Sequence, residues 1–154
     1  MAAVVPDAPL WNHQTTAATF TLYASSTTNA VIGQPDASSK LCLSCHDGTI
    51  ALENFGATTT GTHFITGVYN IGTGLNNDHP VSFTYDAALA TADGGLRNPA
   101  TYASGLGGTI ATDMLIGGKL QCASCHDVHN KTGLPKLLIK TNGISALCLT
   151  CHIK

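Results

Sequence analysis

The pattern of apolar and polar positions along the chain predicts little regular structure. Residues 18–23 alternate between apolar and polar side chains, which is typical of a short strand or an extended segment. Residues 85–92 are predicted to form a short helix with Asp86 in its first turn. A second short helix is predicted at residues 109–114, with Thr109 as its N-cap. No apolar run reaches 18 residues, so no transmembrane helix is predicted.

The composition is poor in the side chains that build a large core. Aromatic residues make up 6% of the chain, which also has 16 glycines and a long connection at 52–118 rich in Gly, Thr and Ala. With 154 residues, the chain is predicted to be one domain, 1–154, in which residues 1–41 form an N-terminal arm. We expect mostly coil with short helices and little sheet, and a centre filled by something other than side chains.

Charge excludes one class of function. Only 10% of the residues are charged, against about 25% in typical soluble domains. The net charge is -2, and Arg97 is the single basic residue between Lys40 and Lys119, so the basic stripe needed for nucleic-acid binding is lacking. The opening residues, MAAVVP, do not have the basic region of a signal peptide.

The six cysteines form three CxxC pairs, and a histidine follows each pair. Two thiols three positions apart lie on one side of a helical turn. From there they can bond to the two vinyl groups along one edge of a haem, and the histidine that follows can ligate the iron. The residues concerned are Cys42, Cys45 and His46; Cys122, Cys125 and His126; and Cys148, Cys151 and His152.

Three disulfides or zinc sites are the alternatives for these cysteines, but neither explains a histidine after every pair. The sequence therefore predicts three covalently bound haem c groups, one for about 51 residues. Stacked haems would supply the apolar surface that the side chains lack, and the apoprotein is expected to be largely unfolded. Because such haem is attached outside the cytoplasm, we expect an exported protein, periplasmic or extracellular, whose export signal has been removed or precedes the first residue.

Four further histidines are candidates for the sixth iron ligand. Bis-histidine ligation of three irons would use three of them and leave one spare. His129 follows His126 by three residues, about 4.5 Å of rise if the helix continues. It cannot reach the far face of the haem that His126 ligates, so it is predicted to ligate a neighbouring haem; the alternative is a surface histidine bonded to a propionate.

His79 is a second candidate. Pro80 favours an extended backbone at His79, and Asp78 is placed to accept the proton of its other ring nitrogen. The alternative is a structural or surface histidine. Met114 is also a potential iron ligand, but enough histidines are available, so we expect it in the core.

His13 and His63 differ in their surroundings. His13 has apolar company in Leu10 and Trp11, suited to packing near a haem, and is predicted to be the third distal ligand rather than a terminal histidine without a role. His63 lies beside Phe64 in a Thr- and Gly-rich stretch and is predicted to be the spare.

With these residues in view, the chain resembles the small multihaem cytochromes of metal-reducing bacteria, whose relatives include extracellular cytochromes that polymerise into haem-lined filaments. The similar stretches are PLWNH, SKLCLSCHDGT, NDHPVSFTYDAALATADGGL, GGKLQCASCHDVHN and ALCLTCH. The resemblance implies His13, His79 and His129 as distal ligands. Many relatives carry a further CxxCH before the PLWNH stretch, which leaves open the haem that His13 serves and allows ligation in a neighbouring subunit.

Three functions follow from this interpretation. The first is electron transfer, not enzymatic catalysis, by a subunit of an extracellular filament, with other copies of the chain and redox proteins or extracellular acceptors as partners. The second is a discrete periplasmic three-haem shuttle, for which the low charge offers little partner steering. The third is a haem reductase with one open iron, which would require a candidate histidine to stay unused.

Overall fold

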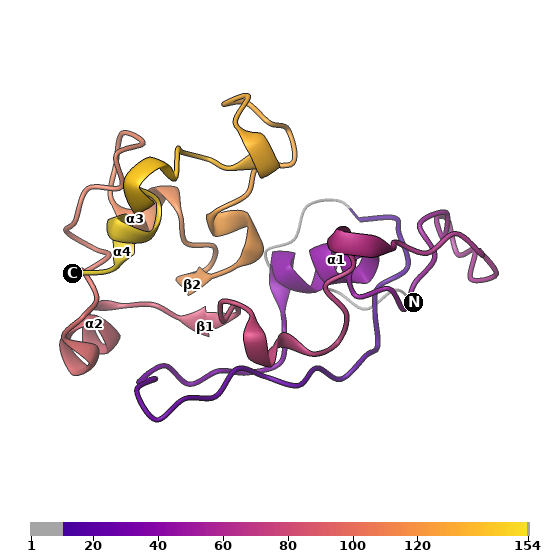
Figure 1. The fold of residues 1–154 in the computed structure, drawn as a ribbon, viewed down its shortest axis with the longest axis horizontal. Helices are drawn as coiled ribbons and strands as arrows, with labels where there is room; N and C mark the ends of the chain where they lie inside the picture. The colour runs from indigo at the N-terminus through magenta and orange to yellow at the C-terminus, as the bar shows by residue number, and fades with distance from the viewer. Residues whose placement is uncertain (1–10, 154) are drawn as a thin grey trace. The chain divides into compact units, whose positions relative to one another are not determined.

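The computed structural model describes residues 11–153, and most of this part of the chain is coil. It contains four α-helices, at α1 (Ala37–His46), α2 (Ala87–Asp93), α3 (Ile110–Asp113) and α4 (Cys148–Cys151). Strands β1 (Phe83–Thr84) and β2 (Lys119–Leu120) form the one sheet within these residues. Single turns of 3₁₀ helix occur at Gly67–Tyr69, Leu75–Asn77, Cys122–Ser124, Pro135–Leu137 and Gly143–Ser145. The predicted fold class, mostly coil with short helices and little sheet, is confirmed (Figure 1).

The chain divides into two compact units. The first unit comprises Met1–Ala24 and Ile32–Ser82, and the second comprises Ser25–Val31 and Phe83–Lys154. The first CxxCH motif therefore lies in the first unit, whereas the other two lie together in the second. The single domain at 1–154 stays a prediction.

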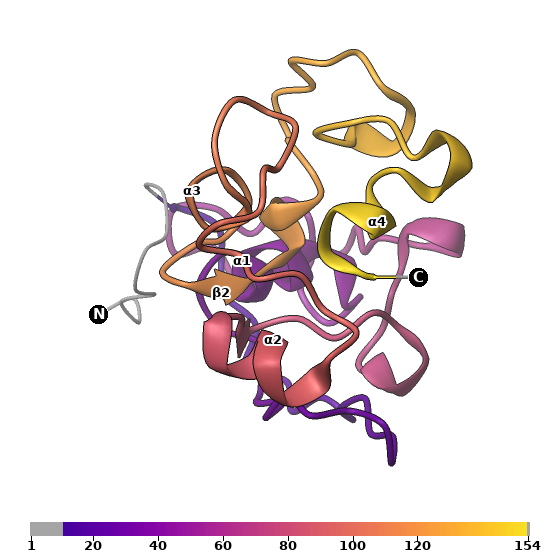
Figure 2. The same ribbon diagram turned by 90° about the vertical axis from the view of Figure 1, so that its left-hand side faces the viewer.

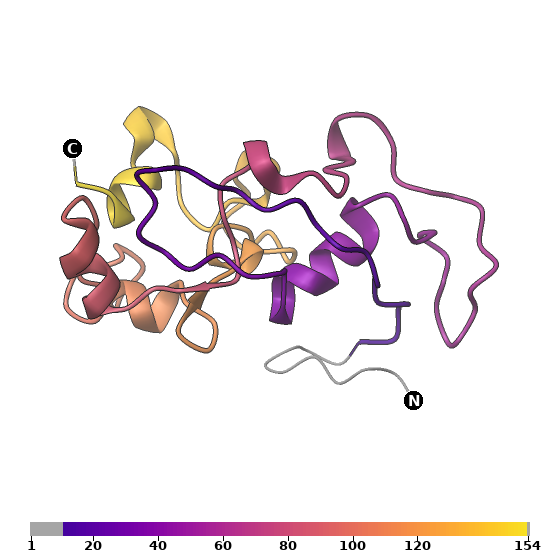
Figure 3. The same ribbon diagram turned by 90° about the horizontal axis from the view of Figure 1, so that it is seen from below.

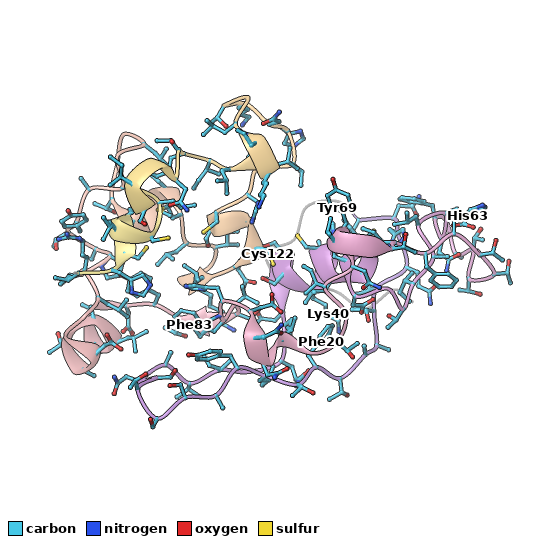
Figure 4. All side chains as sticks on the ribbon, viewed as in Figure 1. Phe20, Lys40, His63, Tyr69, Phe83 and Cys122 are labelled. Carbon is cyan, nitrogen blue, oxygen red and sulfur yellow. The ribbon has the colours of Figure 1, made fainter. Side chains whose placement is uncertain are left out.

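The first unit is built on an extended segment packed against α1. Phe20, Leu43 and Leu75 are buried together, with Ala18 and Leu22 packed against them. The segment at 18–23 is extended, as predicted, and it pairs through a single parallel bridge between Thr21 and Gly74. Figure 4 shows Phe20 at this core.

Helix α1 holds the first motif through buried small polar groups as well as Leu43. The Ser44 hydroxyl donates to the carbonyl of Lys40, 2.8 Å away, and accepts from the backbone N–H of Thr16 at 3.0 Å. After α1 the chain makes a wide coil excursion before the turn at Gly67–Tyr69, as Figure 3 shows. The helix is thus fixed on one side by residues that precede it by more than twenty positions.

In the second unit, short helices are joined by long loops (Figure 2). Asp86 caps α2 by accepting the backbone N–H of Leu89 at 2.8 Å, so it precedes the first turn in which it was predicted. Thr109 is the N-cap of α3, as predicted, and its hydroxyl accepts the backbone N–H of Thr112. The two helices that the sequence predicts are both present, with α2 beginning two residues later.

The core of the second unit surrounds the two-residue strands. β1 pairs antiparallel with β2, with Phe83 opposite Leu120. Ile110 is completely buried and Met114 is 2% exposed, so Met114 is a core residue as predicted. Within residues 11–153, no helix has both the length and the apolar character to cross a bilayer.

Ile110→Ala is expected to destabilise the holoprotein by about 2–5 kcal/mol, because it removes a large side chain from a fully closed site. Denaturant unfolding of the holoprotein, followed by far-UV circular dichroism, measures the loss. Ile144→Ala is the matched control, since Ile144 is 98% exposed, and it should change stability by less than about 0.5 kcal/mol. Equal effects of the two substitutions would contradict the packing described for α3.

Candidate haem-binding sites

The first motif lies at the end of α1, and its histidine is held by the turn at Gly67–Tyr69. His46 Nδ1 is 2.8 Å from the carbonyl oxygen of Tyr69, and the carbonyl of His46 accepts from the backbone N–H of Ile71 at 2.7 Å. A carbonyl oxygen can only accept, so Nδ1 carries the proton in this hydrogen bond. Nε2 then presents a lone pair, which is the state a metal-ligating imidazole needs. Figure 4 shows Tyr69 in this turn beside α1.

The second motif repeats this arrangement on a different backbone. Cys122–Ser124 forms one turn of 3₁₀ helix, and His126 follows in an antiparallel bridge to Leu138. His126 Nδ1 is 2.8 Å from the carbonyl oxygen of Lys136. The same tautomer argument leaves Nε2 of His126 as the nitrogen that can bind iron.

The third motif is also a single helical turn followed by a bridged histidine. Helix α4 carries Cys148 and Cys151, and His152 forms an antiparallel bridge with Leu96. The carbonyl of Cys151 accepts from the backbone N–H of Arg97 at 2.8 Å, and the Ile153 N–H donates to Gly95 at 2.7 Å. A segment about 55 positions earlier therefore fixes the backbone on both sides of His152.

All three motifs fit covalently bound haem. The six cysteines are free thiols; Cys148 is exposed and the others are partly exposed. In each motif the pair spans a single helical turn, as bonding to one edge of a macrocycle requires. Neither a disulfide nor a group of three or more His, Cys, Asp or Glu side chains placed to share a metal ion is present among residues 11–153.

The second and third motifs lie near each other. Burial raises the pKa of the Cys151 thiol to about 11, and the charge of Cys125 adds to this shift. Burial also raises the pKa of Cys125, with Cys122 and Cys148 contributing. The thiols of the two motifs in the second unit therefore influence one another electrostatically. The close contact of two haems that the CHxxH spacing predicts stays a prediction.

A buried carboxylate follows the first motif. Asp47 is 4% exposed, and its oxygens accept from the Thr16 hydroxyl at 2.5 Å and from the Thr49 amide at 2.7 Å. Burial raises the pKa of the Cys45 thiol, and the charge of Asp47 raises it further. The negative charge of Asp47 therefore acts on Cys45, one of the two attachment thiols of the first motif.

Cationic and phenolic side chains surround the third motif instead. The Arg97 Nε donates to the carbonyl of Leu149 at 3.2 Å. The Lys140 ammonium donates to the Thr150 hydroxyl at 2.8 Å and to the carbonyl of Ser104 at 2.6 Å. Each of the residues between the two cysteines of this motif thus receives a hydrogen bond from a positively charged side chain.

Tyr85 completes the contacts of the third motif. It is 3% exposed, and its hydroxyl donates to the carbonyl of Arg97 at 2.6 Å and to that of Cys151 at 3.3 Å. Burial raises the pKa of Tyr85 far above its usual range. The phenol is therefore neutral and serves as a donor to the motif backbone.

His13 lies beside the first motif. It is 5% exposed, and its ring nitrogens are 3.9 and 4.0 Å from the Cys45 sulfur. Trp11, as expected from the sequence, and Phe55 contact the imidazole edge-on, whereas the expected neighbour Leu10 lies outside the described residues. One ring nitrogen faces the carbonyl of Gln14 and the other that of Ala51, so one of them must leave its partner for His13 to bind iron.

His79 and His129 are both exposed. His79 Nδ1 is 2.9 Å from the carbonyl oxygen of Pro80, and the expected contact of its other ring nitrogen with Asp78 stays a prediction. The helical turn of the second motif ends before His126, so the expected rise to His129 along a continued helix does not apply. Instead, the backbone N–H of His129 donates to Asp127 in a turn, and this hydrogen bond lowers the pKa of the Asp127 carboxyl. The ligand roles of His13, His79 and His129 stay predictions.

His63, the predicted spare, lies on the coil excursion after α1 (Figure 4). Its Nδ1 is 2.8 Å from the Glu53 carboxylate, and its side chain is 84% exposed. The backbone N–H of Thr62, followed by the His63 side chain, lowers the pKa of Glu53 to about 2. This carboxylate orients His63 toward solvent.

Sequence reasoning missed the groups that support the motifs. Two of them, at Tyr69 and Lys136, are backbone carbonyls, which leave no residue-type signature. Arg97 did have a signal, because it is the single basic residue between Lys40 and Lys119. Tyr85 and Lys140 have no feature in the sequence that indicates a contact with the third motif.

The comparisons with known proteins agree with these sites. The model of the doubled CXXCH motif family matches residues 116–154, about a quarter of the chain, which includes the second and third motifs. No curated protein matches the chain. The paired motif supports a multihaem c-type cytochrome with covalently bound haem and an electron-transfer role.

Proposed function

We propose that this protein transfers electrons through three covalently bound, bis-histidine haem c groups and does so as an exported subunit of an extracellular filament. The observation that carries the proposal is the backbone anchoring that all three motifs share. All three histidines follow a helical turn of paired cysteines and are joined to a remote segment by backbone hydrogen bonds. Such anchoring fixes the backbone that carries each histidine, and in His46 and His126 a hydrogen bond at Nδ1 also orients the ring, as an axial ligand needs.

The haem supplies one-electron chemistry when bound, and the chain's residues hold and orient it. The thiols of each cysteine pair would form the covalent links, and His46, His126 and His152 would provide the proximal nitrogens. Tyr69 and Lys136 fix the tautomers of His46 and His126 through their carbonyls. A bound imidazole held in this way does not need to reorganise when the charge at the iron changes.

The sixth ligands are assigned to His13, His79 and His129. His13 is buried against Cys45, which supports a role at the first motif. His129 belongs to the second unit, where two attachment sites lie together, which supports ligation of the haem at the third motif. With all sixth positions filled, no iron is left open to a substrate, so electron transfer without catalysis is the expected activity.

His129→Ala is expected to convert one haem from low spin to high spin, because it removes one strong-field ligand while all thioether links remain. Electron paramagnetic resonance and the optical spectrum of the ferric holoprotein measure the change. His63→Ala is the matched control and should leave all haems low spin, since His63 is exposed and paired with Glu53. A low-spin spectrum in the His129 variant would remove it from the ligand set.

The filament is supported by the low proportion of charged residues, 10%, which gives little repulsion between copies. Long-range transfer also needs an open head-to-tail interface, because a closed symmetric contact ends the array. Electron microscopy of the purified holoprotein is expected to show regular filaments. Single small particles that persist at high protein concentration would instead favour a discrete periplasmic shuttle.

A further inference from the structure

The two units carry opposite net charge. With histidines neutral, the first unit has five acidic residues and one basic residue, a net charge of -4. The second unit has four acidic and six basic residues, a net charge of +2. The acidic residues of the first unit are Asp7, Asp36, Asp47, Glu53 and Asp78, and its basic residue is Lys40. The overall charge of -2 therefore conceals a division between the unit with one motif and the unit with two.

The same division is found in direct contacts at the motifs. Asp47 follows the first motif histidine immediately and is almost fully buried, so its charge is poorly screened by solvent. Lys40 is on the same helix, but among the described residues its ammonium forms no ion pair with Asp47.

At the third motif the contacting charges are positive. Arg97 and Lys140 are both partly buried, and they donate to Leu149 and Thr150, the two residues between the cysteines. The Arg97 guanidinium lies over the ring of Tyr102 at 4.1 Å, which holds it in place.

Two of the four carboxylates in the second unit, Asp93 and Asp113, form hydrogen bonds with groups other than these cations. Asp93 accepts from Asn29 and from the backbone N–H of Gly95. Asp113 accepts from Ser104 and from the backbone N–H of Gly108. In the described residues, neither carboxylate is hydrogen-bonded to Arg97 or Lys140.

We propose that these charges set the order of the reduction potentials, with the haem at the first motif the lowest and the haem at the third motif the highest. The inference rests on the proposed function, in which all three irons have the same axial ligands. Ligand identity then does not distinguish the sites, and local charge is a remaining determinant of potential. Adding one electron adds one negative charge and breaks no bond, so it is opposed beside Asp47 and favoured beside Arg97 and Lys140.

Within one chain, this order directs electrons from the first motif to the third. One electron leaves the site of lower potential and enters the site of higher potential, with no proton required. At equilibrium, a single electron on the chain would therefore reside mainly on the haem of the third motif, in the second unit, and least on the haem of the first unit.

Spectroelectrochemical titration of the purified holoprotein tests the order. Lys140→Met is expected to lower the highest-potential step by about tenfold in its reduction equilibrium constant, ~59 mV for one electron. Lys140→Arg keeps the charge and should leave this step near its wild-type value, which separates charge from packing. Lys131→Met removes the same charge from an exposed position of the same unit, beside Asp127, and should not move the highest step.

Asp47→Asn provides the opposite shift and is expected to raise the lowest-potential step by a similar factor. Because Asp47 is buried, the Asp47→Asn variant can fail to accumulate. The comparison of Lys140→Met with Lys140→Arg then decides whether local charge sets the potential. An unmoved highest step in Lys140→Met, or equal shifts in Lys140→Met and Lys131→Met, would overturn the inference. Absence of covalent haem in the wild-type sample would instead contradict the proposed function, so the two failures are distinguishable.

Discussion

The anchoring of the motif histidines by remote backbone is the constraint on which the rest of the structure depends. The second and third motifs form single helical turns, and the first ends the ten-residue helix α1; all three helices are too short to be stable by themselves in water. The first is held through Tyr69 and Ile71, the second by residues 136–139, and the third by Gly95 and Arg97. Long coil connections are needed to bring these partners to the motifs, which is why a chain with so little regular structure has many long-range hydrogen bonds.

Much of the candidate chemistry could be predicted from the sequence because CxxCH is local. The spacing of Cys42 and Cys45 specifies a helical turn, and Thr109 marks the start of α3 by capping chemistry. The low aromatic content also correctly predicted coil. By contrast, the carbonyl partners at Tyr69 and Lys136 depend on tertiary contacts, and any residue type offers the same oxygen.

One geometric condition used for His129 does not hold, for an identifiable reason. A continued helix at the second motif would place His129 about 4.5 Å along the axis from His126, but the antiparallel bridge between His126 and Leu138 takes the chain out of helical geometry. A backbone contact with a later segment, which has no signature in the local spacing, therefore sets the conformation after the motif.

The central claim is that all three motifs carry covalently bound haem. Intact mass spectrometry of the purified holoprotein under denaturing conditions tests it most directly, because thioether-linked haem stays on the chain when non-covalent groups are lost. The account predicts a mass equal to the polypeptide plus three haems. A mass that corresponds to the polypeptide without haem, with its cysteines either reduced or paired in disulfides, would contradict it.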